Sequence, residues 1–361
     1  MQRQLSRRAR EHRPSFLRPG LRLYAYVSTA DNSVSVVDLV KLATVAHVPV
    51  GGPVSAMREH PTRAEIWGVS SNGGFAWVLD SRTSQVAARI PVGALPYSID
   101  FSADGRRAYI PALGSNSLSM IDCVTRQVII QAPTGAQPVA ARVSADGKLV
   151  LSVNKKDASI GVYDAANLQL RSTVGVIPDP EDAIILADNS AAFILSRTQK
   201  RLSVVDLRKG LLLTNLELAG IPSQMILKPD GGELYVLSPE SHGLQAINTW
   251  THEVGDYLVL GSAPTRGVLL PDTGELYVAD TGSGGVTPVD INFRRIGRSI
   301  PAGQSPGALR FDPADKPRLL LVVSQSSGDL SIIRIASDRA GGLLTMIPVG
   351  DQPRELAVKL F

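Results

Sequence analysis

The sequence has little of the residue types that most metal and thiol-based catalytic centres use. Cys123 is the only cysteine, and there are five histidines among the 361 residues. One cysteine excludes an intramolecular disulfide and leaves the redox compartment open. Because metal sites gather several soft or neutral nitrogen ligands at one point, and these residues are few and scattered, we predict neither a bound metal nor a cofactor.

Recognisable catalytic and membrane signals are also absent from the sequence. No GxSxG, HExxH, phosphate-loop or dinucleotide fingerprint occurs in a strand-to-helix context, so no catalytic residue is assigned and enzymatic activity stays an open question. No apolar run approaches the roughly 18 to 20 residues that a membrane-spanning helix needs. We therefore expect a soluble chain without a membrane span.

Outside the N-terminus, neither sign of charge is in large excess. The formal net charge is +4, and residues 1–20 hold six arginines against Glu11, a balance of 6 − 1 = +5 that leaves −1 for residues 21–361. A nearly neutral body lacks the long-range field that attracts a polyanion. We expect residues 1–20 to be a disordered basic tail, and we expect no nucleic-acid binding except through that tail.

Two ladders of residues repeat along the rest of the chain with one period. After a first step of 43, the prolines recur every 42 residues until a last step of 47, and a second ladder of acidic or amide residues recurs every 42 residues throughout. The prolines are Pro53, Pro96, Pro138, Pro180, Pro222, Pro264, Pro306 and Pro353, and the second ladder is Asp38, Asp80, Asp122, Asp164, Asp206, Asn248 and Asp290. A period in the low forties without helical patterning predicts an all-β propeller of four-stranded antiparallel blades.

Each repeat contains the turn residues that four short strands require. Asp104-Gly105 and Asp146-Gly147 supply the positive φ angles of a tight hairpin between the first two strands. The ladder aspartate ends the third strand, where its short side chain can cap the following turn.

The ends of the chain predict how the ring closes. Residues 23–51 supply the last three strands of a blade, and residues 353–361 supply a first strand with nothing after it. Together they complete one blade, which leaves no open sheet edge. We predict a single propeller domain over residues 21–361 with eight blades, the alternative being seven, and expect a monomer.

The segment YVSTADNSVSVVD, from Tyr26 to Asp38, resembles the signature of the YVTN-repeat propellers. That family includes YncE-like and surface-layer-type propeller proteins, and ADGRRAYI, PDGGELYVL and PDTGELYVAD in other repeats are similar to it. The resemblance implies a propeller fold and a periplasmic or extracellular location, and its motifs specify no chemistry. Because Ser6-Arg7-Arg8 is followed by no apolar segment, the sequence contains no recognisable export signal and a cytoplasmic location stays open.

Candidate site residues lie where the repeats stop resembling one another. Packing between blades makes the same demand of every repeat, whereas one asymmetric ligand needs different side chains from different blades. Two residues beyond each ladder proline the sequence varies, from Ser55 and Ser98 to charged residues, while the next residue stays apolar or small. The binding candidates at the channel mouth are Asp100, Arg142, Asp182, Gln224, Arg266, Arg310 and Glu355. The alternative is that they pair with one another across a solvated channel.

A second candidate is a basic patch formed by neighbouring loops. Its residues are Lys155, Lys156, Arg197, Lys200 and Arg201, and nearby acids such as Asp179, Glu181 and Asp182 could neutralise it.

These patterns favour a non-catalytic binding or scaffold protein that presents a loop-lined channel mouth to a protein, glycan or small ligand. One alternative is a propeller enzyme of the lactonase, lyase or haem-bearing type, which would need a convergent acid and base or an axial histidine; only His242 is expected on the right face. A second alternative is nucleic-acid binding through the arginine-rich tail.

Overall fold

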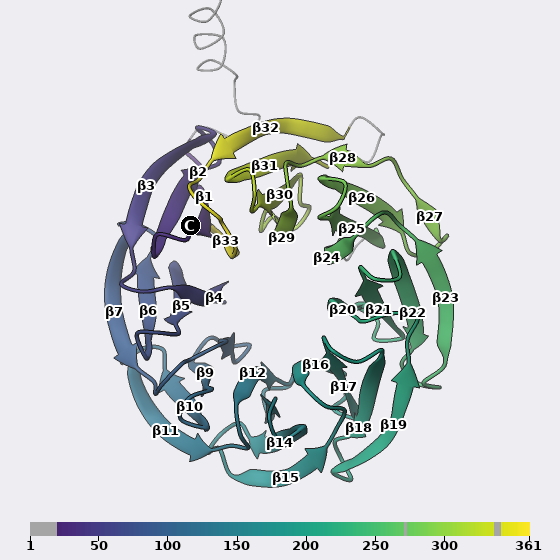
Figure 1. The fold of residues 1–361 in the computed structure, drawn as a ribbon. Coiled ribbons are helices and arrows are strands. Elements are labelled where there is room, and N and C mark those ends of the chain that lie inside the picture. Colours follow the sequence, from purple (N-terminus) through teal and green to yellow (C-terminus); the bar gives the residue numbers. More distant parts are fainter. Residues whose placement is uncertain (1–19, 271–272, 336–340) are drawn as a thin grey trace, which may run out of the picture.

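The computed structural model describes residues 20–270, 273–335 and 341–361. All regular elements in these ranges are β-strands, and they form eight antiparallel sheets around a central channel (Figure 1). The predicted all-β, eight-bladed propeller is thus confirmed, and the seven-bladed alternative is wrong. The predicted tail lies outside the described residues, apart from Gly20. Nothing in the described ranges is a helix long and apolar enough to cross a membrane.

In each of the first four blades the strands run in chain order from the channel outward, except that the last strand of the chain is the innermost strand of the first blade. The first blade contains β33 (Leu356–Leu360), β1 (Leu23–Ser28), β2 (Ser33–Asp38) and β3 (Ala43–Pro49). The second contains β4 (Val54–Glu59), β5 (Glu65–Ser70), β6 (Phe75–Asp80) and β7 (Gln85–Pro91). The third contains β8 (Asp100–Phe101), β9 (Arg107–Ala112), β10 (Ser117–Asp122) and β11 (Gln127–Pro133). The fourth contains β12 (Pro138–Val143), β13 (Leu149–Asn154), β14 (Ser159–Asp164) and β15 (Leu170–Gly175).

The other four blades follow the same order. The fifth contains β16 (Pro180–Ile185), β17 (Ala191–Ser196), β18 (Arg201–Asp206) and β19 (Leu211–Glu217). The sixth contains β20 (Gln224–Leu227), β21 (Glu233–Ser238), β22 (Gly243–Asn248) and β23 (Val254–Val259). In the seventh, β24 (Pro264–Leu270), β25 (Glu275–Asp280) and β26 (Gly285–Asp290) are joined by an outer strand split into β27 (Arg295–Ile296) and β28 (Ile300–Pro301). The eighth contains β29 (Pro306–Phe311), β30 (Leu319–Ser324), β31 (Asp329–Arg334) and β32 (Gly342–Pro348).

The ladder aspartates cap the turns after the third strands, as predicted. Oδ1 of Asp38 accepts hydrogen bonds of 2.9 Å from the backbone N–H groups of Val40 and Lys41. Asp122 makes the same two contacts with Val124 and Thr125 at 2.8 Å. These turn amides have no strand partner, so the recurring side-chain acceptor explains why the ladder recurs in the first seven blades.

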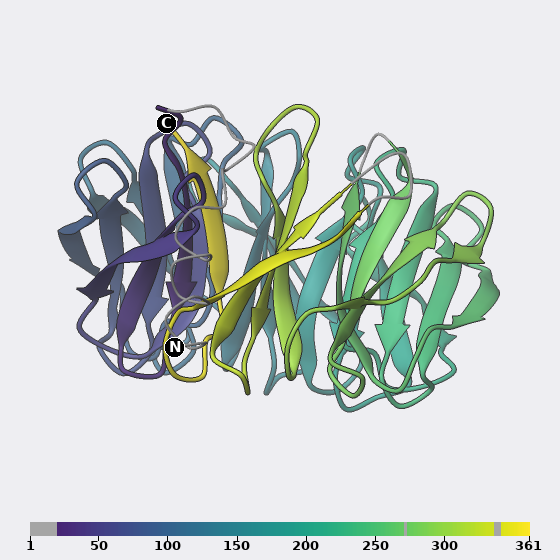
Figure 2. The ribbon, with the colours of Figure 1, turned by 90° about the horizontal axis from the view of Figure 1, so that it is seen from above.

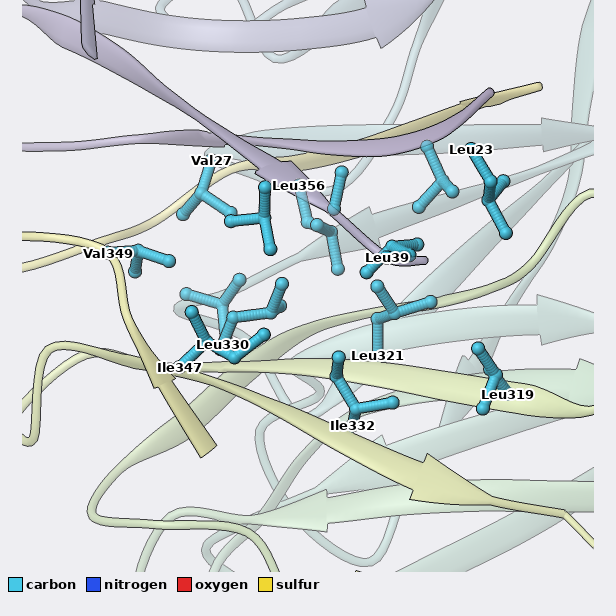
Figure 3. Close-up of a cluster of buried hydrophobic side chains, with 14 residues drawn as sticks. Leu23, Val27, Leu39, Leu319, Leu321, Leu330, Ile332, Ile347, Val349 and Leu356 are labelled. Atoms are coloured by element: carbon cyan, nitrogen blue, oxygen red, sulfur yellow. The ribbon is translucent and has the colours of Figure 1, made fainter. Parts of the chain in front are cut away.

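The ring closes within the first blade, as predicted, and this blade packs against the eighth. β33 pairs with β1 in antiparallel register, from Leu23 opposite Leu360 to Val27 opposite Leu356. Figure 3 shows the cluster of 14 buried apolar residues that this closure completes, with side chains from both blades facing one another. Leu356 is 1% exposed, and burying a side chain of that size stabilises a fold by roughly 1.5–3 kcal/mol.

Figure 2 shows the ring edge on, with strands crossing the disc between its two faces. The proline face carries the segments that enter the innermost strands, together with the loops between second and third strands. The hairpin face carries the turns between first and second strands and between third and fourth strands. Because each innermost strand starts at the proline face, its first residues lie around that mouth of the channel.

Candidate functional site

The innermost strands leave one edge of each blade without a strand partner, so its backbone groups need other partners. The backbone N–H of Gly267 donates to Oε1 of Gln224 in the preceding blade over 2.7 Å, and Nε2 of Gln224 donates to the Gly267 carbonyl oxygen over 3.1 Å. In the same way, the N–H of Val143 donates to Oδ2 of Asp100 over 3.0 Å. Some channel side chains therefore bridge neighbouring blades through hydrogen bonds to the backbone.

Two arginines of the channel meet strand-edge carbonyl groups. Nη1 of Arg142 donates to the carbonyl oxygen of Ala141 over 2.8 Å, and Nη1 of Arg310 donates to that of Leu309 over 2.9 Å. Each bond uses one of the five N–H donors of a guanidinium group. The remaining donors are available to carboxylates or to a ligand.

Two ion pairs join four neighbouring blades across the channel wall. Nη1 of Arg58 lies 2.7 Å from Oδ1 of Asp100, between the second and third blades. Nη2 of Arg142 lies 2.5 Å from Oδ1 of Asp182, between the fourth and fifth blades. We call this side of the channel the paired half. On this side the alternative interpretation of the sequence holds, because these candidates pair with one another.

The other side of the channel, from the sixth blade through the eighth to the first, is called the unpaired half. Arg266, Arg310 and Glu355 form no ion pair among the described residues, although all three lie around one cavity. Burial lowers the pKa of the Arg266 guanidinium, with a further contribution from Arg197, while Glu355 and Asp182 oppose the shift. Burial also raises the pKa of the Glu355 carboxyl, against the pull of Arg310 and Arg266.

A cavity of about 510 Å³ opens at the proline face among these side chains. Arg142, Gln224, Arg266, Arg310 and Glu355 line it, and so do Arg58 and Arg354. Asp100 and Asp182 do not line it but pair with two of its arginines. Its volume lies within the roughly 300–1,000 Å³ that is usual for small-molecule sites. All seven predicted channel-mouth residues thus either line the cavity or contact a residue that does.

Sequence reasoning missed Arg58 and Arg354 as lining residues. Arg58 lies 42 residues before Asp100 and Arg142 lies 42 after it, so the repeat period itself could have found Arg58. The proline ladder hid it, because its first step is 43 residues. The strand register corrects the same slip: Ala56, not Ser55, lies opposite Val69, as Asp182 lies opposite Leu195.

Three residues of the predicted basic patch have acidic partners. Nζ of Lys155 lies 2.7 Å from Glu181, Nζ of Lys200 lies 2.6 Å from Glu240, and Nε of Arg201 lies 2.6 Å from Glu217. Lys156 and Arg197 are exposed. Acidic residues of the same or the next blade thus neutralise most of the patch, and only Glu181 was among the acids expected to do so.

The aromatic and histidine residues divide between core and surface. Trp67 and Trp77 are fully buried, whereas Trp250 is 72% exposed. His242 lies at the proline face with Nδ1 2.7 Å from the carbonyl oxygen of Ser262, outside the cavity lining. No three His, Cys, Asp or Glu side chains of the described ranges are grouped as a metal site.

A larger cavity, of about 750 Å³, lies between the outer strands of the seventh and eighth blades. It opens where Pro288, which has no N–H, interrupts the pairing of β26 with the outer strand. Its position follows from this break in the sheet, and it lies away from the channel mouth.

Three solved structures of similar fold give a context for this geometry. Dihydro-heme d1 dehydrogenase NirN in complex with DHE has a TM-score of 0.79 and 16% identity, and the match covers 95% of this chain and 76% of that one. Kuenenia stuttgartiensis hydrazine synthase has a TM-score of 0.63 and 18% identity over 79% and 96% of the two chains. A functionally unknown protein from Desulfotomaculum acetoxidans DSM 771 has a TM-score of 0.60 and 12% identity over 77% and 94%.

These likenesses, all far below a quarter identity, establish the propeller fold alone. No protein-family model matches the chain, and a search of curated proteins finds no match. Membership of the YVTN-repeat family therefore stays a prediction, as does the exported location that the resemblance implies.

Proposed function

We propose that this chain is a non-catalytic binding protein whose channel mouth, on the proline face, holds a small anionic ligand. The observation that carries the proposal is the unpaired half of the channel. Arg266 is partly buried and its charge is not matched by an ion pair in the described structure. Because a cation withdrawn from water is costly unless it is paired, a bound anion would supply the missing partner.

The dimensions of the cavity favour a small ligand over a protein or a long glycan. A recess of about 510 Å³, lined by side chains from the innermost strands of several blades, can enclose a small molecule on most of its surface. A rigid ring also keeps the lining arginines in place before the ligand arrives, which lowers the entropy cost of binding. We retain the single domain over residues 21–361 and the monomeric state as parts of this proposal.

The enzymatic alternatives receive less support from the lining. Glu355 is the only carboxylate that lines the cavity in the described structure, and no histidine lines it. A lyase or lactonase would need a second group of suitable basicity beside Glu355. The NirN structure is a complex with DHE, but the axial histidine that we expected of a haem-bearing propeller has no counterpart in this lining.

The test is a calorimetric titration of small carboxylates and inorganic phosphate, each with an uncharged analogue, into the full chain. We expect at least one anion to bind and its uncharged analogue not to. Arg266→Gln should abolish that binding, while Lys148→Gln should leave it unchanged, because Lys148 is an exposed residue of the hairpin face whose partner is Asp146 at 3.3 Å. Anion binding that survives Arg266→Gln, or that is lost in Lys148→Gln, would contradict the proposal.

A further inference from the structure

The unpaired half contains an acceptor as well as cations. Glu355 lies between Arg310 of the eighth blade and Arg58 of the second, and the backbone N–H of Met57 lies near its carboxylate. An ionised carboxylate has about four acceptor positions and no donor, so one backbone N–H leaves most of them unused. A ligand that fits this cavity therefore needs hydrogen-bond donors near Glu355 and a negative charge near the arginines.

This arrangement discriminates among anions. A simple apolar carboxylate would gain from Arg266 and Arg310 but would be repelled by Glu355, with no donor to offset the repulsion. An anion that carries hydroxyl groups can pair its charge with the arginines and donate a hydroxyl hydrogen bond to Glu355. Such a bond to an ionised acceptor is roughly twice as strong as a bond between neutral groups.

The rest of the cavity lining contains both polar and apolar side chains. Ser98 and Gln325 add polar groups around the cavity, whereas Ala308 and Leu309 contribute an apolar part of its wall. Gly307 leaves room, since a Cβ atom built there would have Val323 O, at 4.0 Å, as its nearest neighbour. A carbon chain with hydroxyl groups along it presents both kinds of surface.

We propose, on the basis of the proposed anion-binding function, that the ligand is a polyhydroxylated carboxylate of the sugar-acid class. Its carboxylate binds Arg266 and Arg310, and a hydroxyl group donates to Glu355. The unpaired half thus selects a ligand that offers both a negative charge to the arginines and a hydrogen-bond donor to Glu355. Net charge alone does not determine the selection.

The experiment compares three six-carbon probes by calorimetry with the full chain: gluconate, hexanoate and sorbitol. Gluconate has both the carboxylate and the hydroxyls, hexanoate has only the carboxylate, and sorbitol has only hydroxyls. We expect gluconate to bind at least tenfold more tightly than hexanoate, and sorbitol not to bind measurably. Glu355→Gln keeps an acceptor for Met57 but removes the charge, so it should reduce the preference for gluconate to about threefold or less.

Two controls separate the ways in which the proposal could fail. Gly307→Leu should fill the cavity and abolish gluconate binding while the melting curve by circular dichroism stays cooperative. Equal binding of gluconate and hexanoate, or tighter binding of inorganic phosphate than of gluconate, would overturn the sugar-acid class and leave the anion-binding function standing. Binding of gluconate that is unaffected by Arg266→Gln and by Gly307→Leu would overturn both.

Discussion

The two halves of the channel are built on the same repeat and differ in how their charges are satisfied. In the paired half, Arg58 and Arg142 each lie against a carboxylate of the next blade, at 2.7 and 2.5 Å. In the unpaired half, Arg266 and Arg310 share a cavity with Glu355 without an ion pair in the described structure. The innermost strand edges of both halves need the same kind of hydrogen-bond partners, so the difference lies in the side chains. One half is complete in itself, and we propose that a ligand completes the other.

The largest effect should come from removing the C-terminal segment that contains Glu355 and the strand that closes the ring. Deletion of residues 353–361 removes β33 and exposes the edge of β1 together with the cluster around Leu356. The loss is comparable with the total stability of a domain, which is about 5–15 kcal/mol. We expect association and a non-cooperative melt by size-exclusion chromatography and circular dichroism. An unchanged, monomeric truncation would contradict the closure.

Binding should distinguish the halves next. Arg266→Met with Arg310→Met removes both cations of the unpaired half, and gluconate affinity should fall by at least about 30-fold, because truncating a buried charge contact costs roughly 2–5 kcal/mol. The comparison variant deletes one whole pair, Arg142→Met with Asp182→Leu, which keeps the net charge. Arg142 lines the cavity but its charge is already paired, so calorimetry should give a clearly smaller loss than in the first double variant. Equal losses in the two double variants would remove the distinction between the halves.

The two halves should rank in the opposite order when stability is measured, because a variant of the paired half should lose more stability than a variant of the unpaired half. Arg142→Met leaves the carboxylate of Asp182 without its partner at 2.5 Å, and the free energy of unfolding should fall by about 1 kcal/mol. Arg266→Met removes a partly buried cation that has no ion pair in the described structure, so stability should stay the same or rise. Urea unfolding followed by fluorescence measures both. A larger loss in Arg266→Met than in Arg142→Met would show that Arg266 is a structural residue.

The smallest effect concerns pH. Burial raises the pKa of Glu355 above its ordinary value of 4.5, so the folded state holds this proton more tightly than the unfolded state. Stability therefore falls as pH rises from the ordinary value through the raised one, and Glu355→Gln should lose that fall. Asp312, whose pKa is also raised by burial, remains in both proteins. The difference in unfolding free energy should therefore favour Glu355→Gln increasingly above about pH 4.5 and vanish below it. A difference that is constant with pH would contradict the placement of Glu355.

Sequence periodicity was sufficient to predict the blades, because every repeat must cap the same turns and fill the same space between sheets. The capping aspartates are the clearest case, since Asp38 and Asp122 bond equivalent backbone amides. The closing strand also followed from the sequence, because an open edge is costly and only residues 353–361 could cover it.

Which charged residues of the channel form ion pairs, and which do not, could not be predicted from the repeat. Whether Arg142 reaches Asp182 depends on the spacing of neighbouring blades, which no repeat pattern records. Arg58 was missed because the proline ladder steps by 43 residues at that point, and a shift of one residue moves a side chain to the other face of a strand. Trp250 follows a capping residue, Asn248, and its exposure depends on a turn that the period alone does not orient.

A crystal structure of the full chain saturated with gluconate would test most directly whether a ligand completes the unpaired half. We predict ligand density at the proline face within hydrogen-bonding distance of Arg266, Arg310 and Glu355, with the Arg58–Asp100 and Arg142–Asp182 pairs still intact. Density at the hairpin face, or density that breaks the two pairs while leaving Arg266 without an anionic partner, would contradict this division of the channel.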